Sequence, residues 1–267
     1  MKRIAWLTDI HLNFLTDAQT ADFLAEVAEV RPDAVLISGD IAESHDVDRY
    51  LERLQQGIGA TIDFVLGNHD FYHGSIAETR GRVAQLCAAT TGLNYLTLQR
   101  EPVRLSPHVG LVGHDGWADG RAGDFMRSGV SMFDYRLISD LAGRDRRERL
   151  EMLHALGDEA ASHVREILPR ALAQFRDVVF LTHVPPVREA CWHGGHISDD
   201  EWSPHFTCVA VGEALLEVMT AYPNHRLTVL CGHTHGQGET QPLPNVQILT
   251  GGAEYGHPAI QRVMEFD

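Results

Sequence analysis

Five short clusters of Asp, His and Asn, each directly after an apolar run, constrain this chain more than any other feature. The clusters are Asp9–His11, Gly39–Asp40, Gly67–Asp70, Thr182–Pro185 and Gly232–His235. Apolar runs such as Ile4–Leu7 predict buried strands that end in a loop. Loops at the ends of sheet strands are where α/β proteins assemble their sites. We therefore expect the five clusters to meet in space, although they lie far apart in sequence.

The charge balance narrows the classes of partner. The 267 residues are 44% hydrophobic, which suffices for a sizeable core. Lys and Arg number 22 against 37 Asp and Glu, so the net charge is −15. Duplex nucleic acid and anionic lipid attract mainly Lys and Arg, so both are disfavoured as partners. A small anionic substrate stays possible, because a bound metal can supply local positive charge.

The cysteines and the N-terminal residues indicate the cellular compartment in which we expect the protein. Cys87, Cys191, Cys208 and Cys231 show no C-x-x-C spacing, which favours free thiols over disulfides or a structural zinc site. The first apolar run ends at Asp9, too short for a signal peptide. No uncharged stretch approaches the roughly 18 residues of a membrane span. We expect a soluble, cytoplasmic protein that does not enter a membrane.

The first ninety residues alternate between strand and helix patterns. Strands are predicted at Arg3–Thr8 and in the apolar runs that end at Gly39 and Gly67. Helices are predicted from Asp17, which could cap the first one, and over Val47–Gln56 and Ser75–Ala89. A βαβαβ order of this kind predicts parallel strands joined by right-handed crossovers.

The pattern after residue 90 predicts a second, partly antiparallel sheet. Its strands are expected at Tyr95–Leu98, Val103–Leu105 and Val109–Gly113. Further strands are expected at both ends of the Val178–Cys231 strand–helix–strand unit, and two final strands at Val246–Thr250 and Ala259–Glu265 close the chain. A long helix is predicted from about Asp145, and Pro169 should kink or divide it. We expect one domain over residues 1–267, with excursions at about 114–175 and 186–206.

The residue types in the clusters suit a transition metal. Asp9 and His11, like His233 and His235, are two residues apart, so in an extended backbone both side chains of a pair point to one side. Carboxylate, imidazole and amide oxygen together favour Mn, Fe or Zn over Ca. Each residue alone has an ordinary explanation, such as a helix cap for Asp40. Only the conjunction of five strand-end clusters in a fixed order indicates a metal site.

The ordered set resembles the calcineurin-like metallophosphoesterase family. The family pattern runs D-x-H, G-D, G-N-H-[DE], H and G-H-x-H, and residues 9 to 235 meet it in full. The resemblance implies an α/β fold of two packed mixed β-sheets flanked by helices, a four-layer αββα sandwich.

The resemblance also implies a site with two transition-metal ions, Mn, Fe or Zn. One ion would be bound by Asp9, His11 and His235, the other by Asn68, His183 and His233, and Asp40 would bridge them. His69 would protonate the leaving oxygen, in a catalytic set with Asp70. Such a His needs a carboxylate to orient it, and either Asp70 or Glu43 could do so.

The motifs imply a phosphoester hydrolase that uses in-line attack by a metal-bound hydroxide. The phosphoprotein phosphatase branch has Asp where this chain has Glu43 and usually Glu where it has Asp70, so that branch is disfavoured. The motif set more closely resembles the bacterial phosphodiesterase branch, and this resemblance implies a phosphodiesterase on small nucleotide-type substrates. The alternatives are a phosphomonoesterase or pyrophosphohydrolase with the same site, and a non-catalytic metal-binding scaffold, which the complete ligand set disfavours.

Substrate choice should come from the two loops His114–Met132 and Pro186–His205. Their candidate substrate-binding residues are His114, Arg121, Trp192 and His196, because Arg or His can hold a phosphate oxygen and Trp can stack on a base. The alternative is that these side chains only pack the loops.

Overall fold

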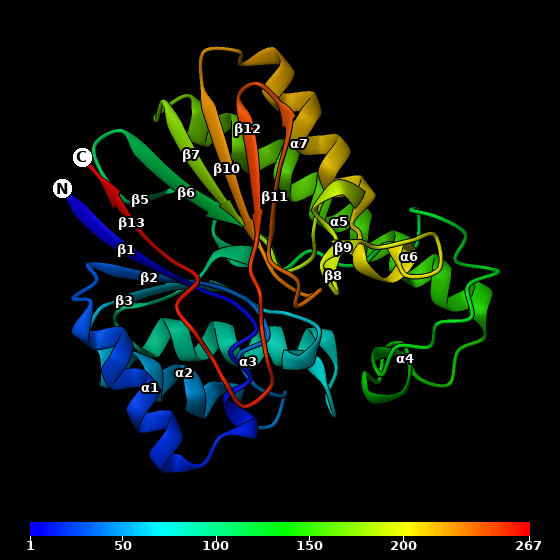
Figure 1. Cartoon of the computed structure of the whole chain (residues 1–267), viewed down its shortest axis with the longest axis horizontal. Coiled ribbons are helices and arrows are strands. Elements are labelled where there is room, and N and C mark those ends of the chain that lie inside the picture. The colour runs from blue at the N-terminus through cyan, green and yellow to red at the C-terminus, as the bar shows by residue number, and fades with distance from the viewer.

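Two β-sheets pack face to face between two layers of helices in the computed structural model, which describes residues 1–267 (Figure 1). The first sheet has the strand order β13-β1-β2-β3-β4. Its strands are β1 (Lys2–Leu7), β2 (Ala34–Ser38), β3 (Thr61–Val65), β4 (Leu93–Tyr95) and β13 (Arg262–Phe266).

The second sheet has the strand order β11-β12-β10-β7-β6-β5. Its strands are β5 (Val103–Arg104), β6 (Val109–Gly113), β7 (Asp177–Leu181), β10 (Arg226–Cys231), β11 (Gly238–Leu243) and β12 (Val246–Thr250). A separate hairpin pairs β8 (Trp192–His193) with β9 (His196–Ile197).

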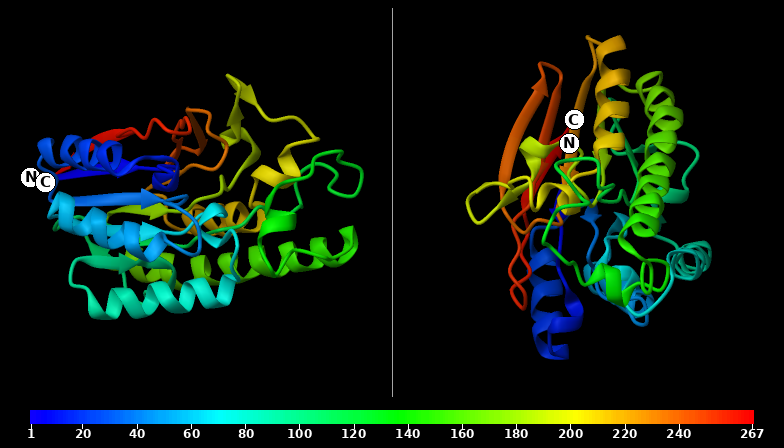
Figure 2. Two further views of the ribbon diagram at one scale, coloured as in Figure 1. Left: turned by 90° about the horizontal axis from the view of Figure 1, so that it is seen from below. Right: turned by 90° about the vertical axis from the view of Figure 1, so that its right-hand side faces the viewer.

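Both sheets have a parallel centre; one edge of the first sheet and both edges of the second are antiparallel. The neighbours β1–β2, β2–β3 and β3–β4 are parallel, and so are β6–β7, β7–β10 and β10–β12. Strand β13 joins the first sheet, and β5 and β11 join the second, in antiparallel sense. The pairing of β1 with β13 also brings the two termini side by side (Figures 1 and 2). The parallel strands of a sheet end at one edge, so the loops that follow them can meet.

The helices cover the outer face of each sheet (Figure 2). The first sheet packs against α1 (Asp17–Glu29), α2 (Val47–Ile58) and α3 (Ile76–Ala89), and the second against α5 (Arg146–Leu172) and α7 (Val209–Ala221). Two single-turn helices, α4 (Asp134–Leu137) and α6 (Ser203–Phe206), lie in the excursions at the right of Figure 1.

Three apolar clusters correspond to the three interfaces of this sandwich. Val27 and Leu51 pack under the first sheet, Ala160 and Leu215 pack on the second, and a middle cluster that includes Trp6 fills the space between the sheets. The burial of apolar surface at these interfaces is the main force that holds the layers together. The arrangement confirms the predicted four-layer αββα fold.

Local details differ from the sequence predictions. Thr16, and not Asp17, caps α1, in a capping box with Gln19. Pro169 does not divide α5, because it lies in the last turn and only three residues of the helix follow it. The predicted strand Tyr95–Leu98 is instead the end of β4 followed by a 3-10 turn, and β4 belongs to the first sheet.

Some elements carried too weak a pattern to be predicted. Strand β11 and the β8–β9 hairpin were missed, because none of their side chains is fully buried and they show no apolar alternation. All four cysteines are free thiols. None of the helices combines the length and apolarity needed to cross a membrane.

A buried carboxylate on β3 makes the stability of this fold depend on pH. Asp63 is 1% exposed, and its side chain has one hydrogen-bond partner, Asn94 Nδ2 at 2.8 Å. Burial raises the pKa of Asp63 from 3.8 to about 6. The folded state therefore holds this proton more tightly than the unfolded chain and loses stability as the pH rises from about 4 to about 6.

We predict that Asp63→Asn raises the free energy of unfolding at pH 8 by up to about 3 kcal/mol, since one pKa unit corresponds to about 1.4 kcal/mol. The gain should shrink at pH 5, and urea unfolding at the two pH values measures it. Asp177→Asn is the control, because Arg226 Nε lies 2.7 Å from Asp177 and the pKa of that carboxyl is lowered. This second variant should not be stabilised at pH 8. An equal gain for Asp63→Asn at both pH values would contradict the prediction.

Candidate metal centre

The loops that follow the strands of the first sheet are bonded to one another. The backbone N–H groups of Asp9 and His11 donate to the carbonyls of Gly39 and Asp40, both at 3.0 Å. The loops after β2 and β3 are joined by the carboxylate of Asp70, which accepts three backbone N–H groups, those of Ile41, Ala42 and Gly67, at 2.8–2.9 Å. The three loops therefore form one hydrogen-bonded unit.

Two carboxylates connect this unit to the loops of the second sheet. The Asp115 side chain accepts the Leu66 N–H at 2.8 Å, and its backbone carbonyl accepts the His183 N–H at 2.9 Å. The Asp9 carboxylate accepts the His233 N–H at 2.9 Å. The Gly232 N–H donates to the carbonyl of His183 at 2.9 Å and closes a ring of loops after β1, β2, β3, β6, β7 and β10.

The backbone at the centre is left-handed and not extended. Five of the seven predicted ligands have positive φ: Asp9 (48°), His11 (40°), Asp40 (53°), His233 (72°) and His235 (57°). The expectation that extended i, i+2 pairs point to one side is therefore wrong, because the chain turns sharply at each residue. Non-glycine residues in this region cost about 1–3 kcal/mol each and persist where the surroundings hold them.

The first set of converging side chains, the Asp9 group, consists of Asp9, His11, Asp40 and His235. One ligand atom from each lies within 4.8 Å of the others. His235 Nε2 is 3.2 Å from His11 Nε2 and 3.4 Å from Asp9 Oδ1, and His11 Nε2 is 3.7 Å from Asp40 Oδ2. These donors surround one point, as the ligands of one ion do.

The second set, the Asn68 group, consists of Asn68, His183 and His233. Asn68 Oδ1 lies 2.9 Å from His183 Nε2 and 2.8 Å from His233 Nδ1. His183 Nε2 is 3.3 Å from Asp40 Oδ1. Asp40 therefore stands between the two groups and turns a different oxygen to each of them.

The electrostatics of the free side chains leave the centre short of positive charge. Burial raises the pKa of Asp40 well above its ordinary value, and the nearby carboxylates of Asp9 and Asp70 raise it further. Burial lowers the pKa of His11 to about 3 and of His233 to about 4, so both imidazoles are neutral. Neutral imidazoles offer a lone pair, and a cation would stabilise the buried carboxylates, so the donor set fits a metal ion.

Two backbone carbonyls settle which histidine nitrogens face the centre. His183 Nδ1 lies 2.8 Å from the carbonyl of Ser38, and His233 Nε2 lies 2.9 Å from the carbonyl of His205. A carbonyl only accepts, so these nitrogens carry the protons. The opposite nitrogens, His183 Nε2 and His233 Nδ1, are left with lone pairs toward Asn68. Partners of this kind orient ligand imidazoles in metal sites.

A residue that the sequence did not single out orients Asn68. The buried carboxylate of Asp134, in α4, accepts hydrogen bonds from Asn68 Nδ2 at 2.9 Å and from the Tyr72 hydroxyl at 2.7 Å. Because the amide nitrogen is held by Asp134, the amide oxygen must face His183 and His233. The excursion that carries α4 thus contributes to the geometry of the centre.

His69 lies at the open side of the centre. Its side chain is 16% exposed, its Nε2 is 3.9 Å from Asp40 Oδ2, and its ring stacks on Tyr72 at 4.2 Å between centroids. Neither carboxylate proposed to orient it does so. Asp70 is fully buried against the backbone of the loops, and the nearest basic groups to Glu43 are His45 and His73. Stacking on Tyr72 holds the ring instead.

A cavity of about 210 Å³ opens onto both groups. Besides the polar residues of the centre, its lining includes His193, Met132, Phe206 and Tyr255, and it contains no Lys or Arg. Both predicted loops supply part of the wall, Met132 from the first and His193 from the second. Tyr255 lies in the loop after β12, a strand of the second sheet that was predicted, but no Asp, His or Asn cluster marks this loop in the sequence.

The four side chains predicted to bind substrate lie outside this cavity. His114 is buried and accepts the Gly116 N–H, and Arg121 pairs with Asp119 and Asp158. Trp192 packs against Gly236 and Gly238, and His196 is exposed on the hairpin. The sequence placed these residues in the correct loops but could not show which way the side chains turn.

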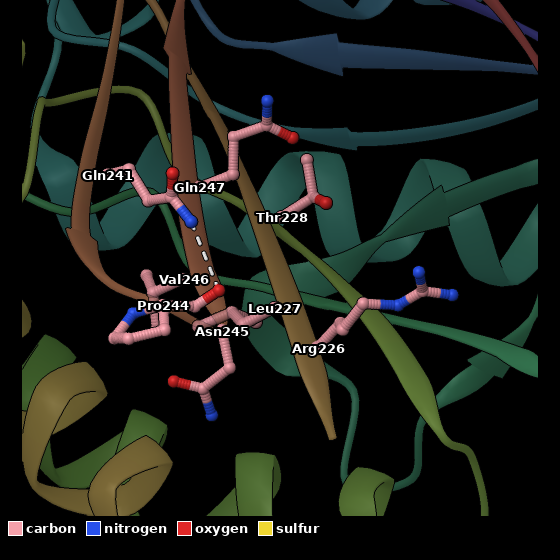
Figure 3. Close-up of a pocket in the computed structure, with 8 residues that line it drawn as sticks. All are labelled: Arg226, Leu227, Thr228, Gln241, Pro244, Asn245, Val246 and Gln247. Atoms are coloured by element: carbon pink, nitrogen blue, oxygen red, sulfur yellow. Dashed lines mark hydrogen bonds between the residues drawn. The ribbon is translucent and has the colours of Figure 1, made fainter. Parts of the chain in front are cut away.

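Another hollow, of about 200 Å³, lies at the opposite ends of β10 and β12 (Figure 3). Its one charged residue is Arg226, whose side chain points away from Gln241 and Gln247 in Figure 3 and pairs with Asp177. This hollow has no set of converging acids, bases or metal ligands. The chemistry of the molecule is concentrated at the other end of the strands.

Comparisons with known proteins agree with this geometry. A family model described as calcineurin-like phosphoesterase matches residues 2–237. No curated protein matches the chain.

Three solved structures with similar folds are distant in sequence. Phosphopantetheinyl hydrolase from Mycobacterium tuberculosis gives a TM-score of 0.68 at 14% identity, over 95% of this chain and 89% of that one. A dimetal phosphatase from Danio rerio gives 0.54 at 15% identity, over 94% and 87%. The protein TT1561 of Thermus thermophilus gives 0.52 at 14% identity, over 98% and 99%. At these identities the likeness shows the fold.

The hydrogen bond from Asn68 to Asp134 predicts that the affinity of the Asn68 group for a metal ion depends on Asp134. Asp134→Ala frees the amide to turn, so affinity for a divalent ion at this group should fall about 10- to 100-fold, while affinity at the Asp9 group stays. Asp134→Asn, whose oxygen can still accept, should restore part of the loss. Calorimetric titration with Mn²⁺ resolves the two sites.

The control for this prediction is Asp140→Ala. Asp140 is a carboxylate of the same excursion, and it caps α3 through the Ile76 N–H at 2.8 Å without touching the centre. Two unchanged ion affinities in Asp134→Ala would show that the Asn68 amide keeps its orientation without Asp134.

Proposed function

Because the chain belongs to the calcineurin-like phosphoesterase family, we propose that this metal-dependent phosphoesterase is a phosphodiesterase that acts on small nucleotide-type substrates. The observation that carries the proposal is the pair of donor groups that share Asp40 beneath one cavity. We also propose a cytoplasmic location, from the four free thiols.

We assign the Asp9 group to one metal ion and the Asn68 group to the other, with Asp40 as the shared ligand. The mixed carboxylate, imidazole and amide donors favour Mn, Fe or Zn. Two such ions, when bound, would activate a water for in-line attack and neutralise charge on the phosphoryl group. The chain's part is to hold the ligands rigidly, through the ring of loops and through Ser38, His205 and Asp134.

His69 is the proposed proton donor to the leaving oxygen. It is not within either donor group, and it stands beside Asp40 at the open side of the centre. Burial, and then the nearby imidazole of His11, lower the pKa of the free residue to about 2. An anionic phosphoryl group next to the ring would favour its charged form and raise that pKa. Substrate binding would therefore prepare the acid.

The cavity favours a diester over a monoester. A monoester dianion needs more positive charge than a diester monoanion, and fixed Lys or Arg groups usually supply it. No Lys or Arg lines this cavity, and Arg121, the predicted phosphate ligand, is paired with acids elsewhere. The net charge of −15 also disfavours a long polyanion. Monoester or pyrophosphate hydrolysis by the same residues is the competing activity.

The test of the proposal is a comparison of kcat/KM for bis-p-nitrophenyl phosphate and p-nitrophenyl phosphate with the Mn²⁺-loaded protein. After correction for their intrinsic reactivities, the diester should be preferred by at least about tenfold, a difference of about 1.4 kcal/mol in transition-state binding. A monoester preference would support the competing activity. Binding of two ions with no hydrolysis of either compound would support a scaffold.

A second prediction separates His69 from the ligands. His69→Gln should keep both ions and lose about 10²- to 10⁴-fold in kcat for diesters with alkoxide leaving groups. The loss should be small for p-nitrophenolate, which leaves without a proton. Asp40→Ala, as the control, should lose ion affinity together with activity. Equal losses for both kinds of leaving group in His69→Gln would argue against an acid role.

A further inference from the structure

We infer that Phe14 and Tyr255 form a binding site for a planar substituent on the leaving oxygen of the substrate, which we call the leaving side. The inference rests on the proposed phosphodiesterase function and deepens it, because it names the chemistry of the substituent. The two residues come from opposite ends of the chain, Phe14 from the turn after His11 and Tyr255 from the loop between β12 and β13.

The two rings lie against each other at the edge of the Asp9 group. Their centroids are 5.0 Å apart with planes inclined at 51°. Tyr255 is 4.6 Å from the ring of His11 and 4.9 Å from that of His235. Pairs of aromatic rings at such separations attract each other in tilted geometries. The pair therefore belongs to the wall of the centre and is not a remote surface patch.

Both rings keep a large exposed area. Phe14 is 53% exposed and Tyr255 is 47% exposed, while Phe206, the aromatic residue beside the Asn68 group, is 5% exposed. An exposed apolar pair beside a polar centre is costly unless it has a partner. Tyr255 also lines the cavity, so a ligand in the cavity can reach its ring.

The loop that carries Tyr255 is held in place on both sides. The Ala253 N–H donates to the carbonyl of His235 at 3.2 Å. Gly252 and the side chain of Gln261 exchange two hydrogen bonds, at 2.9 and 2.8 Å. The ring of Tyr255 is thus presented on an anchored loop, which lowers the entropic cost of binding a ligand.

The position of His69 assigns the pair to the leaving side. The Tyr255 ring is 6.1 Å from the ring of His69, the proposed donor to the leaving oxygen, whereas Phe206 packs on His233 at 5.4 Å. A substituent on the leaving oxygen therefore extends toward Tyr255 and Phe14. A planar group there, such as a nucleobase or an aryl ring, can stack on an aromatic side chain, and the substituent need not carry charge.

Tyr255 contributes its ring as an uncharged group. Burial, and then the carboxylates of Asp40 and Asp9, raise the pKa of its phenol above the ordinary value, so it is neutral at physiological pH. No side-chain or backbone group of the protein bonds its hydroxyl in the structure. Replacement by Phe should therefore preserve the site, and replacement by Leu should remove it.

Binding to the Mn²⁺-loaded protein tests the inference directly. Calorimetry compares diphenyl phosphate, which has planar groups, with diethyl phosphate, which has none. Tyr255→Leu should lower the affinity for diphenyl phosphate about tenfold or more, as expected for loss of one stacking contact. The affinity for diethyl phosphate should change less than about twofold. Tyr255→Phe should retain wild-type affinities. Phe14→Leu should act in the same direction as Tyr255→Leu.

Phe133→Leu is the matched control, because Phe133 is 66% exposed but, unlike Phe14, makes no ring contact with His11 or Tyr255. It should change neither affinity. The ion content of every variant should equal that of the wild type. If Tyr255→Leu lowers the affinities for both phosphates equally, or lowers neither, the inference is overturned.

Kinetics with methyl p-nitrophenyl phosphate test whether the aromatic pair contacts the leaving group, since p-nitrophenolate is the only planar group of this compound. Tyr255→Leu should lower kcat/KM for this compound about tenfold, and Phe133→Leu should not. An unchanged kcat/KM would refute the leaving-side assignment. If the wild type binds diphenyl phosphate through Tyr255 but hydrolyses no diester, the proposed function fails while the aromatic site stands.

Discussion

The centre depends on one constraint, the ring of hydrogen bonds that ties the loops of two separate sheets together. Within each sheet the parallel strands bring their own loops side by side. Between the sheets the connection is made by two buried carboxylates, Asp9 to the His233 N–H and Asp115 to the Leu66 N–H. Asp115 is itself surrounded, by the hydroxyls of Tyr95 and Thr97 and the guanidinium of Arg80. A satisfied polar network of this kind rigidifies a site, whereas an incomplete one would be costly.

The ring explains how the centre tolerates its own strain. Five ligands sit in left-handed conformations that side chains with a Cβ rarely adopt. The same backbone groups that turn sharply are those that bond to neighbouring loops, so strain and restraint occur at the same residues. The buried carboxylate of Asp70 fixes three N–H groups of two loops. Glycine is required at Gly67 for a related reason, since a Cβ there would collide with Asp40 Oδ1.

The surroundings of the centre have a different origin from the centre itself. Ligands come from the ends of the core strands, but the groups that orient and enclose them come from connecting segments. Asp134 lies in the excursion after β6, Phe206 ends α6 before α7, and Tyr255 follows β12. The fold thus supplies a common metal centre, and the connections supply the walls that decide which ester fits. This division is general, because function lies in sites carried by folds.

The sequence by itself determined most of the buried strands, the main helices and the seven residues that converge, because apolar periodicity and short polar clusters at strand ends are local signals. It also determined two of the loops that enclose the cavity, those that supply Met132 and His193. Only the tertiary structure decided which side chains face it: His114 and Arg121 turn to other partners, whereas Tyr255 and Asp134 turn inward. Side-chain direction in an irregular loop is set by hydrogen bonds to residues distant in sequence, and those partners are unknown until the sheets have packed. For the same reason the sequence could not choose between Asp70 and Glu43 as the partner of His69, and the structure places neither of them there.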